Sequence, residues 1–307
     1  MSWFWYAIIT LFCWSGSDLF SKIGCCDEDD KVSHLKMVIA VGTVMGLHAA
    51  YMLVFQGVVI SWSVVWTYLP VSLLYIVSMV LGYVGLRHIE LSISSPICNS
   101  SGAVVAVLCL LSGSLSDILG FDRVLVLAAV LLVCVGVVGL GVVEAREDED
   151  LRKRRQEHAN RRYAKSWLAI CLPIAYCLLD AAGTFADSLV LEKLNEDSAN
   201  VAYELTFFTA ALLCLLYFLL VRGVHFDPKR ERPKYIGACF ETAGQLTYIY
   251  ALNDPEHVMM SAPIISAYCV ASVVWSRIFL HEKLSWKHYL MIGITVCGIV
   301  ILGVFDI

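Results

Sequence analysis

Three acidic residues interrupt long apolar stretches of the sequence, where charged groups are uncommon. Asp18, Asp180 and Glu241 each lie well inside such a stretch. A carboxylate at membrane depth is costly, so each is a candidate functional residue. Acids so placed can bind a cation, carry a proton, or exchange one for the other. The alternative is that each only bonds a neighbouring helix through a nearby hydroxyl or backbone amide.

Polar residues follow two of these acids at helical spacing. Glu241, Gln245 and Tyr248 fit an i, i+4, i+7 pattern, which places them on one face of a helix. A second stripe with the same spacing consists of Asp180, Thr184 and Asp187. A polar face turned toward lipid would be costly, so both stripes are expected to face protein or a cavity. The two stripes therefore predict a lined pathway.

Aromatic residues at similar depth complete a candidate binding site. An aromatic face attracts a cation by roughly 0.5 to 2 kcal/mol, so rings beside interior acids suit an organic cation. Ordinary packing is the alternative role for any single ring. The predicted substrate-binding and coupling residues are Asp18, Asp180, Glu241, Gln245, Trp14, Tyr176, Tyr248 and Tyr268.

Other titratable residues receive weaker predictions. Asp187 and Glu204 fall nearer the ends of apolar segments, where we expect water to reach them. His48 could relay protons or simply pack. Most of the 12 cysteines lie in apolar segments and are interpreted as packing residues. No metal and no cofactor are predicted.

The elements that must position these residues follow from composition. The chain is 59% hydrophobic and only 16% charged, and its charges are bunched. The runs between them reach about 20 residues, the length of a membrane-spanning helix. Backbone groups in lipid must bond within their own segment, so an all-α polytopic membrane protein is predicted. Its ten predicted spans are 3–24, 35–55, 67–86, 92–112, 124–143, 166–187, 200–222, 234–251, 257–280 and 286–305.

A charged run at 144–165 divides these spans into two halves, 1–143 and 166–307, of five helices each. Because five is odd, a duplicated second half would be inserted upside down relative to the first. Such inverted repeats place a substrate site near the membrane midplane. Ser95-Pro96 and Ala262-Pro263 lie at corresponding places in the two halves.

The basic residues predict an orientation in the cytoplasmic membrane. Alternation of ten helices puts all of the 22 Lys and Arg residues on one face except Arg123 and Lys193. The positive-inside rule then places 144–165 in the cytoplasm and both termini outside. The run 144–165 is interpreted as a solvated linker, with a patch that binds anionic lipid as the alternative.

Two short strings resemble a known family. WSGSDLFSK at 14–22 is similar to the first-helix signature of the drug/metabolite transporter superfamily, in its EamA-like ten-helix members. HEKLSWKHYLMIGITVCGIVILGV at 281–304 resembles the ending of these proteins. The connection at 112–123 lacks the acidic element that the resemblance would place there. The resemblance implies a transporter built from two EamA-type repeats.

These observations predict a secondary active transporter of a small organic metabolite or drug-like solute, of amino acid or amine character, working by alternating access and coupled to protons. No Lys or Arg lies near the centre of a predicted helix, which disfavours phosphate-bearing substrates. Motifs for ATP binding, such as G-x-x-x-x-G-K-[ST], and for hydrolysis, such as HExxH, are absent, so no enzyme is expected. The alternatives are a lipid-linked carrier translocase and a membrane-embedded enzyme. The expected partners are a small-molecule substrate, membrane lipids and protons, with no nucleic acid.

Overall fold

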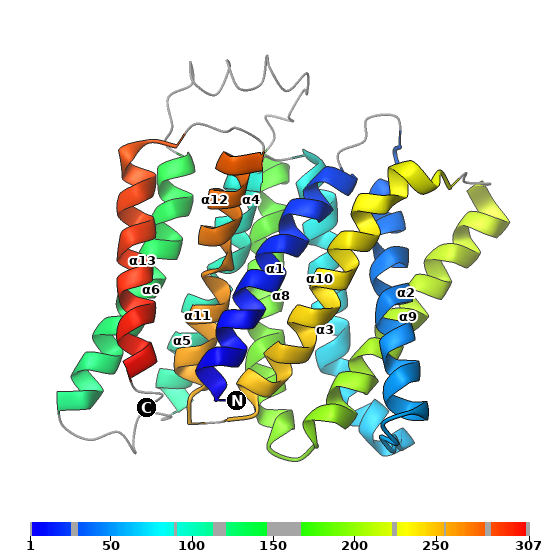
Figure 1. Ribbon diagram of the computed structural model, residues 1–307, viewed down its shortest axis with the longest axis horizontal. Coiled ribbons are helices and arrows are strands. Elements are labelled where there is room, and N and C mark those ends of the chain that lie inside the picture. Colours follow the sequence, from blue (N-terminus) through cyan, green and yellow to red (C-terminus); the bar gives the residue numbers. More distant parts are fainter. Residues whose placement is uncertain are drawn as a thin grey trace.

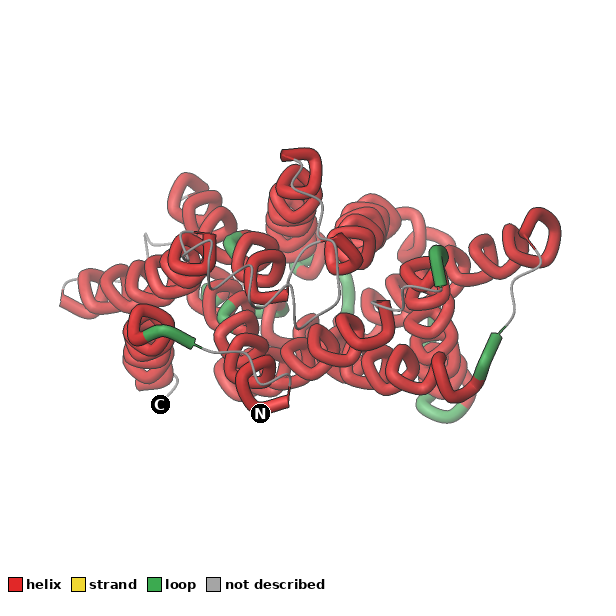
Figure 2. The backbone as a smooth tube through the Cα atoms, turned by 90° about the horizontal axis from the view of Figure 1, so that it is seen from above, coloured by secondary structure: helices red, strands yellow, loops and turns green. Residues whose placement is uncertain are grey.

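A computed structural model describes residues 2–25, 30–88, 91–112, 121–145, 167–222, 226–254, 256–279 and 284–304. Within these ranges every regular element is a helix. The helices stand side by side in one elongated bundle, as Figures 1 and 2 show from the side and from above. The predicted linker 144–165 lies almost wholly outside the described residues.

The helices of the first half follow the predicted spans closely, with ends that differ by a few residues. They are α1 (Trp3–Cys25), α2 (Ser33–Val54), α3 (Trp62–His88), α4 (Leu91–Asn99), α5 (Ser101–Ser112) and α6 (Phe121–Ala145). The second half contains α8 (Trp167–Leu191), α9 (Glu196–Tyr217), a π-helical turn η1 (Phe218–Arg222), α10 (Pro228–Leu252), α11 (Val258–Ser266), α12 (Tyr268–Phe279) and α13 (Trp286–Val304).

Two predicted spans, 92–112 and 257–280, differ from the structure because each is broken into two helices. The breaks fall at Ser100 and Ala267, each four residues after a proline. The N–H of Ser100 bonds the carbonyl of Pro96 at 3.1 Å, and the N–H of Ala267 bonds that of Pro263 at 3.0 Å. A proline removes one helical hydrogen bond, but it does not by itself fix where the helix ends. Interrupted helices of this kind form substrate sites in many transporters.

Seven described helical stretches are long and apolar enough to cross a membrane: Ser33–Val54, Trp62–Leu86, Ser94–Leu111, Val124–Val143, Cys171–Leu191, Glu196–Val221 and Val258–Phe279. A shorter apolar helix covers Trp286–Leu302. The helices α1 and α10 fall outside this set and are also the ones that carry Asp18 and Glu241. The predicted count of ten spans stays a prediction.

Helices of the two halves interlock pairwise. The closest neighbours are α1 with α10, α2 with α9, α3 with α8 and α6 with α13, and α4 and α5 contact α12 and α11. Figure 1 shows two of these pairs plainly, α1 beside α10 and α6 beside α13. Glycines permit the closest approach: a Cβ added at Gly298 would lie 2.7 Å from Val133 Cγ2. The predicted inverted repeat stays a prediction.

Candidate functional site

A cavity with about 710 Å³ of empty space, counted out to its mouth, lies between helices of both halves. Helices α1, α3 and α4 contribute from the first half, and α8, α9, α10 and α12 from the second. Five tyrosines and one tryptophan line it, together with four serines, three acids and one glutamine. This composition is typical of a small-molecule site.

Seven of the eight predicted site residues line this cavity: Trp14, Asp18, Tyr176, Asp180, Glu241, Gln245 and Tyr268. Tyr248 instead lines a smaller cavity that shares Trp14, Tyr176, Asp180 and Tyr268 with the first. Residues far apart in the sequence are therefore brought together around one space. Their role in binding stays a prediction.

Hydroxyl groups of the broken helices hold two of the acids in place. Asp18 Oδ2 accepts hydrogen bonds from Ser95 on α4 at 2.6 Å and from Ser272 on α12 at 2.9 Å. Asp180 Oδ2 accepts one from Ser101, the first residue of α5, at 2.7 Å. These serines flank the helix breaks and were not predicted from the sequence as partners of the acids.

The third acid, Glu241, lines the cavity together with Ser17 of α1. None of the described residues that line the cavity is Lys, Arg or His. The three carboxylates therefore face the space with neutral donors only. In the described part of the chain, no three His, Cys, Asp or Glu side chains converge closely enough to hold a metal ion.

Aromatic rings and unpaired polar groups complete the cavity. The Trp14 ring lies 4.9 Å from that of Tyr248 and 5.8 Å from that of Tyr268, measured between centroids. Four lining residues have a buried polar atom without a hydrogen-bond partner among the described residues: Trp14 Nε1, Gln245 Nε2 and the hydroxyls of Ser21 and Tyr83. Buried polar groups are nearly always satisfied, so unpaired groups around one cavity point to a polar ligand or to water.

The structure corrects the prediction that water reaches Asp187. This side chain is 0% exposed, although it lies four residues before α8 ends. Its two carboxylate oxygens accept hydrogen bonds from Tyr68 at 2.7 Å and from Tyr75 at 3.3 Å. Both tyrosines come from α3, which packs along α8 and covers the acid. Distance from the end of a segment is thus a poor guide to exposure when a neighbouring helix is longer.

Glu204 was likewise predicted to be near water, and this is also wrong. Its side chain is 0% exposed and accepts a hydrogen bond from His48 Nδ1 at 2.7 Å. The pair joins α2 to α9. His48 is therefore not a lone packing histidine, and its predicted alternative as a proton relay stays untested.

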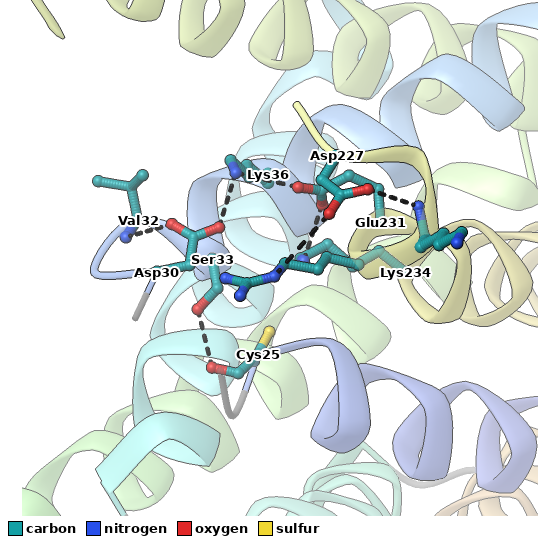
Figure 3. Close-up of polar contacts among 10 residues, drawn as sticks. Cys25, Asp30, Val32, Ser33, Lys36, Asp227, Glu231 and Lys234 are labelled. Carbon is teal, nitrogen blue, oxygen red and sulfur yellow. Dashed lines mark hydrogen bonds and ion pairs between the residues drawn. The ribbon is translucent and has the colours of Figure 1, made fainter. Parts of the chain in front are cut away.

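A cluster of ion pairs joins the two halves where α1 ends and α2 and α10 begin (Figure 3). It was not predicted from the sequence. Lys36 Nζ lies 2.7 Å from Asp30 Oδ2 and 2.9 Å from Glu231 Oε1. Lys234 Nζ lies 2.7 Å from Glu231 Oε2. We call Asp30, Lys36, Glu231 and Lys234 the end cluster.

One member of the end cluster lies in a connection outside the helices. Burial alone would raise the pKa of Asp30, but the hydrogen bonds from Lys36 and the Val32 N–H, with the charges of Lys36 and Lys234, outweigh it. The pKa of this carboxyl is therefore held below its usual value. Nearby, Lys22 Nζ donates to the carbonyl of Leu86, a residue of the cavity wall, at 2.9 Å.

Comparison with known proteins bears on the second half. Residues 167–304 match the model of the EamA-like transporter family. The crystal structure of another protein is similar in fold, with a TM-score of 0.64 and 12% sequence identity. The match covers 99% of this chain and 97% of the chain in that structure. Identity this low supports the fold alone. No curated protein matches the sequence.

Proposed function

We propose, from the premise that residues 167–304 form an EamA-like domain, that the protein is a secondary transporter of a small amine or amino acid. The single observation that carries the proposal is the central cavity, in which three carboxylates face the space without a basic side chain among the described lining residues. A cationic group is the chemical complement of such a site.

The ammonium end of the substrate would lie among Asp18, Asp180 and Glu241. Uncompensated carboxylates in a low-dielectric site attract a cation strongly, and hydrogen bonds to charged groups are the stronger kind. The rings of Trp14 and Tyr268 add a cation–π attraction of roughly 0.5 to 2 kcal/mol. Phosphate-bearing substrates are disfavoured for the same reason, because the acids would repel them.

The other end of the substrate would meet two of the unpaired donors, the N–H groups of Trp14 and Gln245. Trp14 Nε1 and Gln245 Nε2 are buried and unpartnered among the described residues. A carboxylate or carbonyl oxygen on the substrate would satisfy them. This arrangement favours a zwitterionic amino acid over a simple amine.

Transport would couple to protons by exchange at the same acids. A carboxylate that binds an ammonium group must first release any proton it holds, so substrate and proton compete for one site. Alternating access would follow from rocking of the interlocked halves about the cavity, as in other transporters with duplicated halves.

The test uses the purified full chain and a matched ligand pair, leucine and 3-methylbutylamine, which is leucine without its carboxylate. Thermal stabilisation is measured first, and reconstituted liposomes with a pH-sensitive dye then report proton movement. We expect both ligands to stabilise the protein. Asp180→Asn is expected to remove the effect of both, whereas Gln245→Leu should weaken leucine alone, because only leucine has the acceptor.

Cys239→Ala is the matched control, since Cys239 is an exposed residue on the same helix as Gln245. Unchanged transport in Asp180→Asn would remove that acid from the mechanism. If amino acids, primary amines and quaternary ammonium compounds all fail to bind, the proposal fails. The alternative function, a lipid-linked carrier translocase, is then the hypothesis to test.

A further inference from the structure

Asp187 is a buried carboxylate that the proposed binding site does not use. It is 0% exposed and is absent from the walls of both central cavities. The described residues that bond it are two tyrosines, Tyr68 and Tyr75, and neither carries a charge. An ionised carboxylate buried without a cation is strongly disfavoured, so these surroundings favour the protonated form of Asp187.

A chain of hydroxyl groups connects Asp187 to the cavity. Tyr75 lines the cavity and donates to Asp187 Oδ2 at 3.3 Å. Its oxygen lies 2.5 Å from the hydroxyl of Tyr248, which in turn bonds Thr184 Oγ1 at 2.9 Å. Tyr248 and Thr184 line the smaller cavity that also contains Asp180. The acid is thus one hydroxyl removed from the space where substrate would bind.

Each hydroxyl has one proton to give, so the chain can be oriented in two ways. When Asp187 is ionised, Tyr248 donates to Tyr75 and Tyr75 donates to Asp187. When Asp187 is protonated, it can donate to Tyr75, which donates to Tyr248, which donates to Thr184. Both orientations satisfy the same contacts without moving a heavy atom, so the network accommodates both protonation states of the acid.

In the described part of the chain, no side chain that bonds Asp187 is a cation. Helix α8 packs against α3, α4, α5 and α10. The tyrosines around the acid are Tyr68 and Tyr75 from α3 and Tyr248 from α10, with Tyr203 of α9 against the Tyr75 ring. The helices α4 and α5 have no charged residue, and their titratable side chains are Cys98 and Cys109.

We propose that Asp187 is a second proton-binding carboxylate, which receives a proton from the cavity through Tyr75. In the transfer, a hydronium ion in the cavity gives a proton to Tyr75 while Tyr75 passes its own proton to Asp187, which leaves a neutral water. By the longer route Tyr248 takes the proton from hydronium and passes its own to Tyr75, so each hydroxyl again ends with one proton. Asp187 lies toward the end of the bundle where α8 joins α9, away from the end cluster. Asp187 would therefore hold a proton on its way between the cavity and that side of the membrane. This inference rests on the proposed proton-coupled function.

Infrared difference spectroscopy tests proton binding without any substrate. The wild-type protein, moved from mildly acidic to mildly alkaline buffer, should lose a C=O stretching band of a protonated carboxyl. Asp187→Asn should lack that component, while Asp18→Asn and Glu241→Gln keep it. Tyr75→Phe should retain the band but move its pH midpoint, because one hydrogen bond to the acid is gone. An identical spectral change in wild type and Asp187→Asn overturns the proposal.

Liposome transport tests the consequence, with choline as the probe because its permanent charge prevents unaided crossing. Asp187→Asn is expected to lose uptake driven by a pH gradient while choline exchange between equal pH continues. Asp187→Glu should restore the gradient-driven uptake in part. Full gradient-driven uptake in Asp187→Asn overturns the inference.

Two further outcomes remain decisive. If wild type moves no choline, the proposed function fails for that cation, yet the infrared band still decides whether Asp187 binds a proton. If Asp187→Asn does not fold, Tyr68→Phe and Tyr75→Phe decide through the pH midpoint of the band, and an unchanged midpoint in both overturns the proposal.

Discussion

In two regions of this protein, the end cluster and the central cavity, the carboxylates have different kinds of partner. In the end cluster, Glu231 accepts from both Lys36 and Lys234, so its charge is compensated within the protein. In the central cavity, the described residues that bond Asp18 and Asp180 are serines. Both regions join the same two halves of the chain. They differ in whether the counter-charge comes from the protein.

Under the proposed function, this difference separates acids that stabilise an interface from acids that bind a ligand. Acids that are already paired stabilise an interface, and removing one leaves its partners buried and unpaired. Acids that lack a cation are held ready by neutral donors and can take a cation from outside. The position of the lysines, rather than that of the acids, thus indicates which carboxylates are available to a ligand.

The largest expected effect is on the end cluster. Glu231→Gln leaves Lys234, which is only 1% exposed, without its acid, while Lys36 keeps Asp30. Breaking a buried ion pair by removing one partner typically costs about 3 to 5 kcal/mol. We therefore expect a large fall in the free energy of unfolding, measured by thermal or denaturant unfolding of the purified protein in detergent.

Asp227→Asn is the matched control for this experiment, because Asp227 is a partly exposed acid on the same segment and lies 4.0 Å from Arg230. Asparagine caps a helix about as well as aspartate, so stability should hardly change. Equal effects of the two variants would contradict the view that burial and shared pairing make Glu231 structural.

A smaller effect on stability, but a loss of ligand response, is expected in the cavity. Glu241→Gln leaves no lysine unpaired, so the free energy of unfolding should stay within about 1 kcal/mol of wild type. A ligand at a hundred times its Kd stabilises a protein by about 2.7 kcal/mol. Thermal shifts with 3-methylbutylamine should show this gain in wild type and not in the variant. A loss of stability as large as that of Glu231→Gln would erase the distinction between the regions.

The smallest effect concerns pH. The pKa of Asp30 is lowered by Lys36 despite its burial, so its carboxylate stabilises the folded state above its unfolded pKa of about 3.9. That contribution is lost as pH falls through the folded pKa. The stability difference between wild type and Asp30→Asn, about 1 kcal/mol, should thus be constant from about pH 8 to 5 and vanish in stronger acid. A difference that already declines near neutral pH would contradict the assignment.

Helix positions were largely predictable from the sequence, because length and apolar composition are local properties. The predicted span 3–24 corresponds to α1 at Trp3–Cys25. The breaks at Ser100 and Ala267 were not predictable in the same way. Pro96 and Pro263 mark corresponding places, but whether a helix bends through a proline or stops after it depends on the neighbours that receive the freed backbone groups.

The candidate site was predictable where chemistry is unusual for its surroundings. Asp18, Asp180 and Glu241 stood out because acids are rare in apolar segments, and the structure brings all three to one cavity. Asp187 was misjudged because its burial depends on Tyr68, which lies 119 residues away. The end cluster was missed for the same reason, since Lys36 and Glu231 are 195 residues apart and look like ordinary solvated charges.

The pairing of each major helix with one from the opposite half has a consequence for biosynthesis. While the ribosome is still making the second half, α1 has no α10 to cover its polar face, and α3 lacks α8. The newly made first half therefore lacks Ser272 beside Asp18 and Glu231 beside Lys36, although Ser95 and Asp30 are already present. A chain that is truncated near its middle should be recognised by quality control as incomplete, rather than persist as a folded half-protein.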